Sequence, residues 1–249
     1  MQKLKKYLKY QEKRPYMQRR KINDANVIIV AAGASARFGR KTKKIFFLLD
    51  KKPVIIHTIE KFKKFFADSD IIIVVAEEDM LKMRRTLDKF SLNEIRVVKG
   101  GEKRCFSVFN GLKEAAKRRV FIHDGARPFL SGETILSLSR SLLKKNECVA
   151  PAYKPSETVR IIKKGKYEIL DRQNIFLMQT PQACFRDVYL KILEKRIAEN
   201  KFFTDDAEYF INENMKLKII DGDKNNIKIT FGMDIKTAEE IIKKGDSCS

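Results

Sequence analysis

Short apolar runs, separated by stretches long enough for helices, are the feature that most constrains the fold of this chain. The runs cover residues 26–32, 71–76, 95–98 and 120–123. They are nearly continuous in apolar residues, which is typical of strands covered on both faces of a sheet. The stretches between them predict helices over residues 53–66, 79–90 and 103–117. This alternation predicts an α/β fold with a doubly wound, mainly parallel sheet.

The pattern changes after residue 150. Residues 151–172 contain two strand-like segments on either side of Gly165, which predicts a projecting β-hairpin arm over about 151–175. Further helices are expected over 183–200 and 234–244, with a short strand over 217–220. No linker divides residues 26–249, so we expect one domain there. The lysine- and arginine-rich residues 1–25 predict a flexible N-terminal arm.

The net charge of +21 would attract phosphorylated small molecules, nucleic acids or anionic membranes. The lysines are spread through almost every segment and form no basic patch interleaved with aromatic residues, so we expect no specific nucleic-acid partner. No apolar run is long enough to span a membrane, and the N-terminus lacks the apolar stretch of a secretory signal. Four scattered cysteines and two histidines predict free thiols in a reducing cytoplasm and no protein-built metal site.

The first predicted strand runs directly into AAGASARFGRKTKKIF, residues 31–46. Ligands of doubly wound sheets bind at the carboxyl ends of strands, and the amides of small residues can cradle phosphate oxygens there. Arg37 and Lys44 then supply positive charge. The motif is not GxGxxG, because Ser35 occupies the second glycine position, and it is not a Walker A loop. By itself it is also compatible with an ordinary βα turn.

The stretch VFIHDGARPFL, residues 120–130, takes a buried strand into His123, Asp124 and Arg127. A strand that simply ends at the surface, with charges that solvate the turn, is an equally good interpretation of this peptide alone. A functional interpretation needs the rest of the chain.

Six motifs occur in one order along the chain. They are AAGASARFG with Lys44, GGEKRCFSVFNGL at 100–112, HDGARPF at 123–129, DRQNIFLMQTPQ at 171–182, TDDA at 204–207 and NNIKIT at 225–230. In this combination the chain resembles the 2-C-methyl-D-erythritol 4-phosphate cytidylyltransferase family of the non-mevalonate isoprenoid pathway. The resemblance covers about residues 26–244. Each motif is weak alone, and it is the ordered set that is specific.

The resemblance implies a Rossmann-like nucleotidyltransferase fold and the transfer of CMP from CTP to 2-C-methyl-D-erythritol 4-phosphate, with release of pyrophosphate. It also implies Mg²⁺ bound mainly through CTP phosphates and water, and a homodimer formed through the hairpin arm. The nucleophile is a phosphate oxygen that is already ionised at neutral pH, so in-line attack needs neither a general base nor a covalent intermediate. Positioning and positive charge would carry the catalysis.

The resemblance assigns site residues as well. Arg37 and Lys44 would hold the triphosphate and Lys228 would reach the α-phosphate, so these three form the expected catalytic set. Residues that would bind the rest of CTP are Ala31, Ala32, Gly33, Gly101, Glu102, Arg104, Ser107 and Asp124. Residues that would bind the sugar phosphate, two of them reaching across the dimer interface from the arm, are Asp124, Arg127, Thr158, Arg172, Thr180 and Thr204.

The chain departs from the family pattern in three places. Where the family usually has Pro-Lys-Gln, residues 43–45 are Lys-Lys-Ile, so a proline that would stiffen the loop is missing. Gly125 stands where alanine is common, and a small backbone effect is expected. The charge pattern after TDDA is loose, so Thr204 and Asp205 are carried over as hypotheses only.

Three other functions compete with this interpretation. A cytidylyltransferase for ribitol 5-phosphate or another polyol phosphate would share the nucleotide half, but ETVR, DRQNIF and QTPQ favour methylerythritol phosphate. A hydride-transferring Rossmann enzyme is opposed by the missing GxGxxG. A nucleic-acid-binding protein is suggested by the net charge and would bind with a steep salt dependence.

Overall fold

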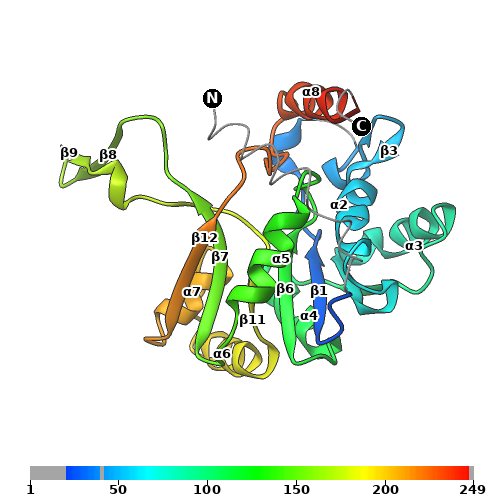
Figure 1. The fold of residues 1–249 in the computed structure, drawn as a ribbon, viewed down its shortest axis with the longest axis horizontal. Helices are drawn as coiled ribbons and strands as arrows, with labels where there is room; N and C mark the ends of the chain where they lie inside the picture. The colour runs from blue at the N-terminus through cyan, green and yellow to red at the C-terminus, as the bar shows by residue number, and fades with distance from the viewer. Residues whose placement is uncertain (1–20, 40–41, 247–249) are drawn as a thin grey trace, which may run out of the picture.

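The computed structural model describes residues 21–39 and 42–246, and its centre is one eight-stranded sheet (Figure 1). The sheet order is β10-β7-β11-β6-β1-β4-β5, with β12 beside β7. In chain order these strands are β1 (Ala25–Val30), β4 (Ile71–Val75), β5 (Arg96–Lys99), β6 (Arg119–Asp124), β7 (Glu147–Tyr153), β10 (Leu177–Met178), β11 (Gln182–Phe185) and β12 (Lys216–Asp221). Two small hairpins are separate from it, β2 (Leu48–Leu49) with β3 (Lys52–Pro53) and β8 (Val159–Lys163) with β9 (Lys166–Leu170).

The sheet is mainly parallel, which confirms the predicted fold class. β1 pairs in parallel with β4 and β6, β4 with β5, and β7 with β12. β11 is antiparallel to β6 and β7, and β10 is antiparallel to β7. From β1 the chain builds β4 and β5 on one side and then returns to the other side as β6. The carboxyl ends of β1 and β6 therefore lie at the topological switch, where doubly wound sheets bind ligands.

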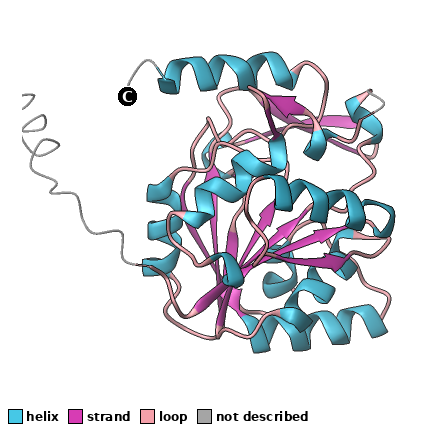
Figure 2. Ribbon diagram, turned by 90° about the vertical axis from the view of Figure 1, so that its right-hand side faces the viewer, coloured by secondary structure: helices cyan, strands magenta, loops and turns pink. Residues whose placement is uncertain are grey.

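Helices cover both faces of the sheet (Figure 2). They are α2 (Val54–Lys63), α3 (Met80–Lys89), α4 (Arg104–Glu114), α5 (Gly132–Ser141), α6 (Arg186–Ala198), α7 (Asp206–Ile211) and α8 (Asp234–Asp246). In β1, Val27 and Ile29 face the layer of α2, α3 and α5, whereas Ile28 faces α4, α6 and α7. Side chains alternate along a strand, so a sheet covered on both faces needs the continuous apolar run seen in the sequence. None of the helices in the described ranges is long and apolar enough to cross a membrane.

The predicted helix over residues 183–200 is wrong at its start. Residues 182–185 form β11, and α6 begins only at Arg186. Ala183, Cys184 and Phe185 are fully buried between β6 and β7, so this short apolar run is an interior strand. Where a short apolar strand runs directly into a helix, hydrophobic periodicity alone does not show where the strand ends and the helix begins. β7, α5 and α7 were not predicted either.

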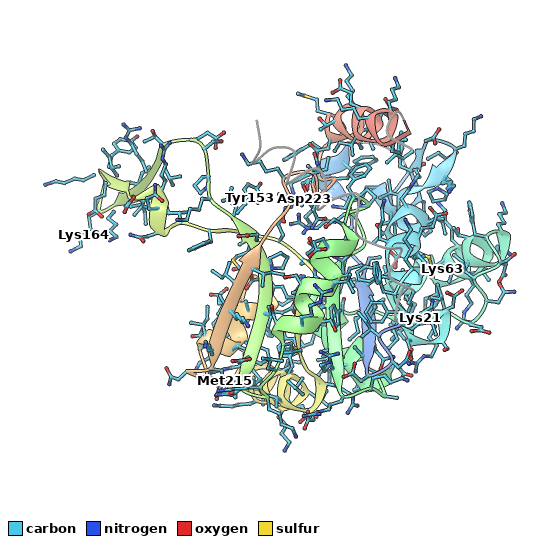
Figure 3. All side chains as sticks on the ribbon, in the orientation of Figure 1. Lys21, Lys63, Tyr153, Lys164, Met215 and Asp223 are labelled. Carbon is cyan, nitrogen blue, oxygen red and sulfur yellow. The ribbon has the colours of Figure 1, made fainter. Side chains whose placement is uncertain are left out.

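The hairpin arm of β8 and β9 projects away from the sheet, on the left of Figure 1, with Lys164 near its tip in Figure 3. Its two strands pair with each other and with no other described strand. Residues 151–153 of the expected arm belong to β7. Residues 1–20 of the expected basic arm lie outside the described residues. Ile22 is buried and its amide donates to the carbonyl of Phe65 at 2.7 Å, so residues 21–25 pack on the domain.

Candidate active site

The carboxyl ends of β1 and β6 are held side by side by backbone hydrogen bonds. Val30 is in register with Asp124, and the amide of Gly125 donates to the carbonyl of Val30 at 2.8 Å. The amide of Ala31 donates to the carbonyl of Val74 in β4 at 2.7 Å. The loops that follow these strands are thereby fixed against each other. The motif after the first strand and the HDGARPF motif meet at one edge of the sheet.

Two adjoining cavities open at this edge. The first, of about 170 Å³, is lined by every residue predicted to bind CTP outside its triphosphate, and also by Lys44 and Lys228. The second, of about 460 Å³, is lined by Asp124, Arg127, Thr180 and Thr204 of the predicted sugar-phosphate residues. Arg104, Asp124 and Lys228 line both cavities. Ligands in the two cavities would therefore meet at these three side chains.

The wall of the first cavity requires a glycine where β5 leads into α4. A Cβ on Gly100 would lie 2.6 Å from the Cβ of Ala32 and 2.8 Å from Oγ of Ser107. The buried hydroxyl of Ser107 accepts a hydrogen bond from the amide of Gly101 at 3.1 Å. Ser107 therefore shapes the loop that lines the cavity. Its predicted role in binding CTP stays a prediction.

Gly125 packs against Ala31, which lines the same cavity. A Cβ at this position would lie 3.0 Å from the Cβ of Ala31 and 3.0 Å from Cδ1 of Ile55. An alanine here would contact both side chains too closely, so both would have to shift slightly. The departure from the family pattern therefore matches the packing of this chain, and its effect is steric rather than only a matter of backbone freedom.

Asp124 is the electrostatic centre of the site. Its carboxylate lies 2.9 Å from Nζ of Lys228, 3.5 Å from Nε of Arg104 and 3.4 Å from Nε of Arg127. Burial alone would raise the pKa of Asp124, but these positive charges outweigh burial and hold its pKa well below its usual range. Asp124 is therefore an anion that gathers three cations between the cavities.

Arg104 is anchored by a second carboxylate behind it. Its NH1 and NH2 groups donate to the two oxygens of Asp206 at 2.9 and 2.7 Å, and the Tyr189 hydroxyl donates to the same carboxylate at 2.8 Å. Asp206 is 1% exposed, so this bidentate pair is shielded from water. Asp205, which the sequence offered only as a hypothesis, lines the second cavity and caps α7 by accepting from the amide of Glu208 at 2.9 Å.

His123 braces the loop after β6. Its Nε2 lies 3.1 Å from the carbonyl of Arg127, and its Nδ1 lies 3.0 Å from the Thr180 hydroxyl, which accepts from the amide of Asp124. A carbonyl can only accept, so Nε2 carries the proton and Nδ1 accepts from Thr180. Burial lowers the pKa of His123 to about 4. A neutral, fully buried histidine at the strand end thus holds the loop in place and is no acid or base for substrate.

Lys228 and Lys44 enter the first cavity from different segments. Lys228 lies in an irregular segment between β12 and α8, beside buried Ile229, whose amide donates to the carbonyl of Ala126 at 2.9 Å. Lys44 begins the short 3₁₀ helix η2 (Lys44–Phe46). Burial and the neighbouring charges of Lys228 and Arg37 lower the pKa of Lys44, although Asp124 opposes them. The crowding of these cations favours a polyanionic ligand, which would relieve their repulsion.

Three of the predicted residues do not line either cavity. Arg37 is exposed, with its guanidinium 5.9 Å from the centroid of the Phe231 ring. Thr158 and Arg172 lie on the projecting arm, and the Arg172 guanidinium donates to the carbonyl of Ser156 at 2.9 Å. Within one chain, the structure does not bring the arm residues to the site.

Several lining residues were missed. Lys103 in the first cavity and Gln179 and Gln182 in the second lie inside the six motifs, and Glu208 directly follows TDDA. Gln182 has a visible structural task, because its side-chain amide donates to Asp205 at 2.8 Å and its oxygen accepts from the amide of Ala207 at 2.7 Å. Their position in the sequence, next to predicted site residues, could have identified them.

Comparisons with known proteins assign the chain to a family. The family model described as 2-C-methyl-D-erythritol 4-phosphate cytidylyltransferase matches residues 25–244. The protein of that name from Clostridium acetobutylicum is 35% identical over 222 residues, which are 87% of this chain and 96% of the relative. The bifunctional enzyme IspD/IspF of Pelagibacter ubique is 37% identical over 212 residues. Those residues are 84% of this chain but 55% of the relative, so the chain spans about half of that protein.

A solved structure agrees with the sequence relatives. The 4-diphosphocytidyl-2C-methyl-D-erythritol synthase of Anaerococcus prevotii superposes with a TM-score of 0.76 at 30% identity, covering 89% of this chain and 99% of that one. The matched region contains both cavities and the residues that line them. The predicted cytidylyltransferase activity is confirmed over the ribitol-phosphate alternative, and the chain belongs to the 2-C-methyl-D-erythritol 4-phosphate cytidylyltransferase family.

Proposed function

We propose that the first cavity holds CTP, that the second holds 2-C-methyl-D-erythritol 4-phosphate, and that CMP is transferred between them. The observation that carries this proposal is the set of residues common to both cavities, Arg104, Asp124 and Lys228. A phosphate oxygen in the second cavity and the α-phosphorus of CTP in the first would meet there. The products are 4-diphosphocytidyl-2-C-methyl-D-erythritol and pyrophosphate.

The proposed mechanism is in-line attack without a covalent intermediate. The main obstacle is the approach of two polyanions and the extra charge on the pentavalent α-phosphorus. Lys228 lies at the junction of the cavities and supplies positive charge beside that phosphorus, while Lys44 holds the triphosphate and the leaving pyrophosphate. Arg37 lines neither cavity, and its exposed side chain would have to turn toward Lys44 to share this role. Loss of one such preorganised contact typically slows an enzyme by about 10²–10³.

Mg²⁺ is the proposed cofactor. Within residues 21–39 and 42–246, no group of three or more His, Cys, Asp or Glu residues is arranged to hold a metal ion. Asp124 borders both cavities but already faces three cations. This donor set fits an ion that takes most of its ligands from CTP phosphates and water, with Asp124 as its protein neighbour. When bound, Mg²⁺ would neutralise phosphate charge.

A homodimer formed through the hairpin arm is also proposed. Ile162, Tyr167 and Ile169 are 62, 74 and 71% exposed on the arm. An isolated two-stranded hairpin is marginal in water, so a partner that covers these side chains would stabilise it. Arg172 and Thr158 of one subunit would then reach the sugar phosphate of the other. Sedimentation of Tyr167→Ser with Ile169→Ser should show monomers, and an unchanged dimer would contradict the arm as interface.

A cytoplasmic location is proposed as well. Among the described residues, Cys105, Cys148 and Cys184 are free and buried. Free thiols are typical of proteins in reducing compartments. Fractionation of cells would test this location directly.

The deciding experiment for the function is pyrophosphate release from CTP and Mg²⁺, with methylerythritol phosphate and ribitol 5-phosphate offered in parallel. Release with methylerythritol phosphate alone is expected. Release with ribitol phosphate alone would keep the nucleotide site and reject the proposed second substrate. If folded protein released no pyrophosphate with either sugar phosphate, the proposed reaction would be rejected.

A further inference from the structure

Lys43 directly precedes Lys44 and lines neither cavity. Its ammonium lies 2.6 Å from Oδ2 of Asp79 and 2.7 Å from Oε1 of Glu78. Both carboxylates belong to η4 (Glu77–Asp79), the turn between β4 and α3. These ion pairs join the loop after β1 to the loop after β4.

The pair with Asp79 is the shielded one. The side chain of Asp79 is 10% exposed and that of Glu78 is 69% exposed. Exposed ion pairs contribute little, so the link depends mainly on Asp79. Asp79 directly precedes α3, where the helix dipole favours a carboxylate. Burial alone would lower the pKa of Lys43, but the two carboxylates outweigh burial and raise it, so the ammonium stays charged.

The backbone at Lys43 has the conformation that a proline would impose. Its φ is −57° and its ψ is 139°, and its carbonyl accepts from the amide of Phe46 at 3.0 Å to close η2. The pyrrolidine ring fixes φ at about −65°. A second contact holds η2 from the same side, because Nζ of Lys82 in α3 lies 4.3 Å from the centroid of the Phe46 ring.

We propose that Lys43 is a positioning residue, and that its ion pair with Asp79 fixes the start of η2 so that Lys44 points into the first cavity. The ion pair then does for this loop what a proline ring would do covalently. Lys43 does not bind phosphate, because its ammonium is engaged by two carboxylates outside the cavity. This inference rests on the proposed function, in which Lys44 contacts the triphosphate.

The test compares four variants by pyrophosphate release and by the melting temperature of the protein. They are Lys43→Met, Asp79→Asn, the double variant, and Lys43→Pro. Lys43→Met and Asp79→Asn should each lower kcat/KM for CTP by on the order of tenfold, since small misplacements of a catalytic group slow reactions strongly. The KM for methylerythritol phosphate should not change. The double variant should be no worse than either single variant, because both remove one link.

Lys43→Pro should recover most of the loss, since it restores the φ restraint without the charge. Lys52→Met is the matched control, because Lys52 also has an ion pair of 2.8 Å, with Glu60, but precedes no catalytic residue. It should leave kcat/KM unchanged.

Three results would overturn the inference. They are wild-type kinetics for Lys43→Met, additive losses in the double variant, or a Lys43→Pro enzyme as slow as Lys43→Met. The last two together would mean that Lys43 contacts the nucleotide directly. If Lys43→Met does not fold, Asp79→Asn with Lys43→Pro decides the question. Failure of the proposed function is distinguishable, because the wild type would then release no pyrophosphate.

Discussion

The junction of the two cavities and the hairpin arm are opposite kinds of region. At the junction, Asp124 and Arg104 are fixed by partners from several segments of the same chain, and Asp206 behind them is almost completely buried. On the arm, β8 and β9 pair with each other and with no other strand that the structure describes, and Tyr167 is 74% exposed. The difference teaches that one chain is sufficient to organise the nucleotide side. On the sugar-phosphate side, one chain brings Arg127, Thr180 and Thr204 to the second cavity, and the proposed dimer would add Thr158 and Arg172 from a partner.

Asp206→Ala is the substitution that should destabilise the junction most. This change leaves the Arg104 guanidinium and the Tyr189 hydroxyl without their shared carboxylate. Removal of one partner of a buried ion pair typically costs about 3–5 kcal/mol. We expect the free energy of unfolding in urea to fall by about this much. The neighbouring Asp205→Ala removes a helix cap and the hydrogen bond from Gln182, and should cost about 2 kcal/mol. Equal losses in both variants would contradict the anchoring role of Asp206.

Lys44→Ala and Lys228→Ala should lower the rate of catalysis without a large effect on folding. Each is expected to lower kcat by about 10²–10³ while CTP binding, measured by calorimetry, weakens much less. Lys195→Ala is the matched control, because Lys195 lies on α6, lines neither cavity and pairs with Glu213 at 2.9 Å. A near-normal kcat in either active-site variant would remove that lysine from the catalytic set.

Acid should weaken the junction through His123. The folded protein holds the pKa of His123 at about 4, below the usual value near 6.5, so the unfolded chain takes up the proton first as pH falls. The contribution of His123 is therefore complete above about pH 6.5 and is lost progressively between about pH 6.5 and 4.

From about pH 7.5 to about pH 5, this linkage should lower the free energy of unfolding by about 2 kcal/mol. His123→Asn should lack that part of the decline, and urea titrations at the two pH values measure the difference. The stability that Asp124 contributes through its depressed pKa is complete above about pH 4 and is lost only below it, so it does not change between these two pH values. Parallel declines in both proteins would show that His123 is not the titrating group.

The arm should give the smallest effect and the most selective one. Arg172→Ala is expected to raise the KM for methylerythritol phosphate by about tenfold, with KM for CTP unchanged, because one charged hydrogen bond is lost. An unchanged KM for the sugar phosphate would show that the arm does not take part in binding it.

Mixing Arg172→Ala with Lys228→Ala protein sharpens the comparison. If the arm serves the partner subunit, some mixed dimers contain one site with both residues intact, and activity should exceed the sum of the two proteins alone. Purely additive activity would mean that each arm serves its own chain or none.

The strand pattern predicted where the loops of the junction meet, and the family resemblance supplied Arg104, Asp124 and Lys228 as the site residues there. The strands that became β1, β4 and β6 are continuous apolar runs, and the polar residues after them must meet at one edge. Asp206 could not be chosen over Asp205, because only the start of α7 decides which carboxylate faces Arg104 and which caps the helix. β11 was missed because its buried apolar residues merge with α6 in the sequence. No local sequence pattern shows which surface the hairpin arm contacts.

The charge centre around Asp124 has a consequence for the order in which the protein becomes competent during synthesis. Arg104 and Arg127 leave the ribosome well before Lys228, which lies beyond β12 near the end of the sheet-forming sequence. A nascent chain released after β12 would contain every strand of the central sheet yet lack the lysine common to both cavities. A chain that stops there would lack catalytic ability, and the reaction centre is completed only after the whole sheet has been synthesised.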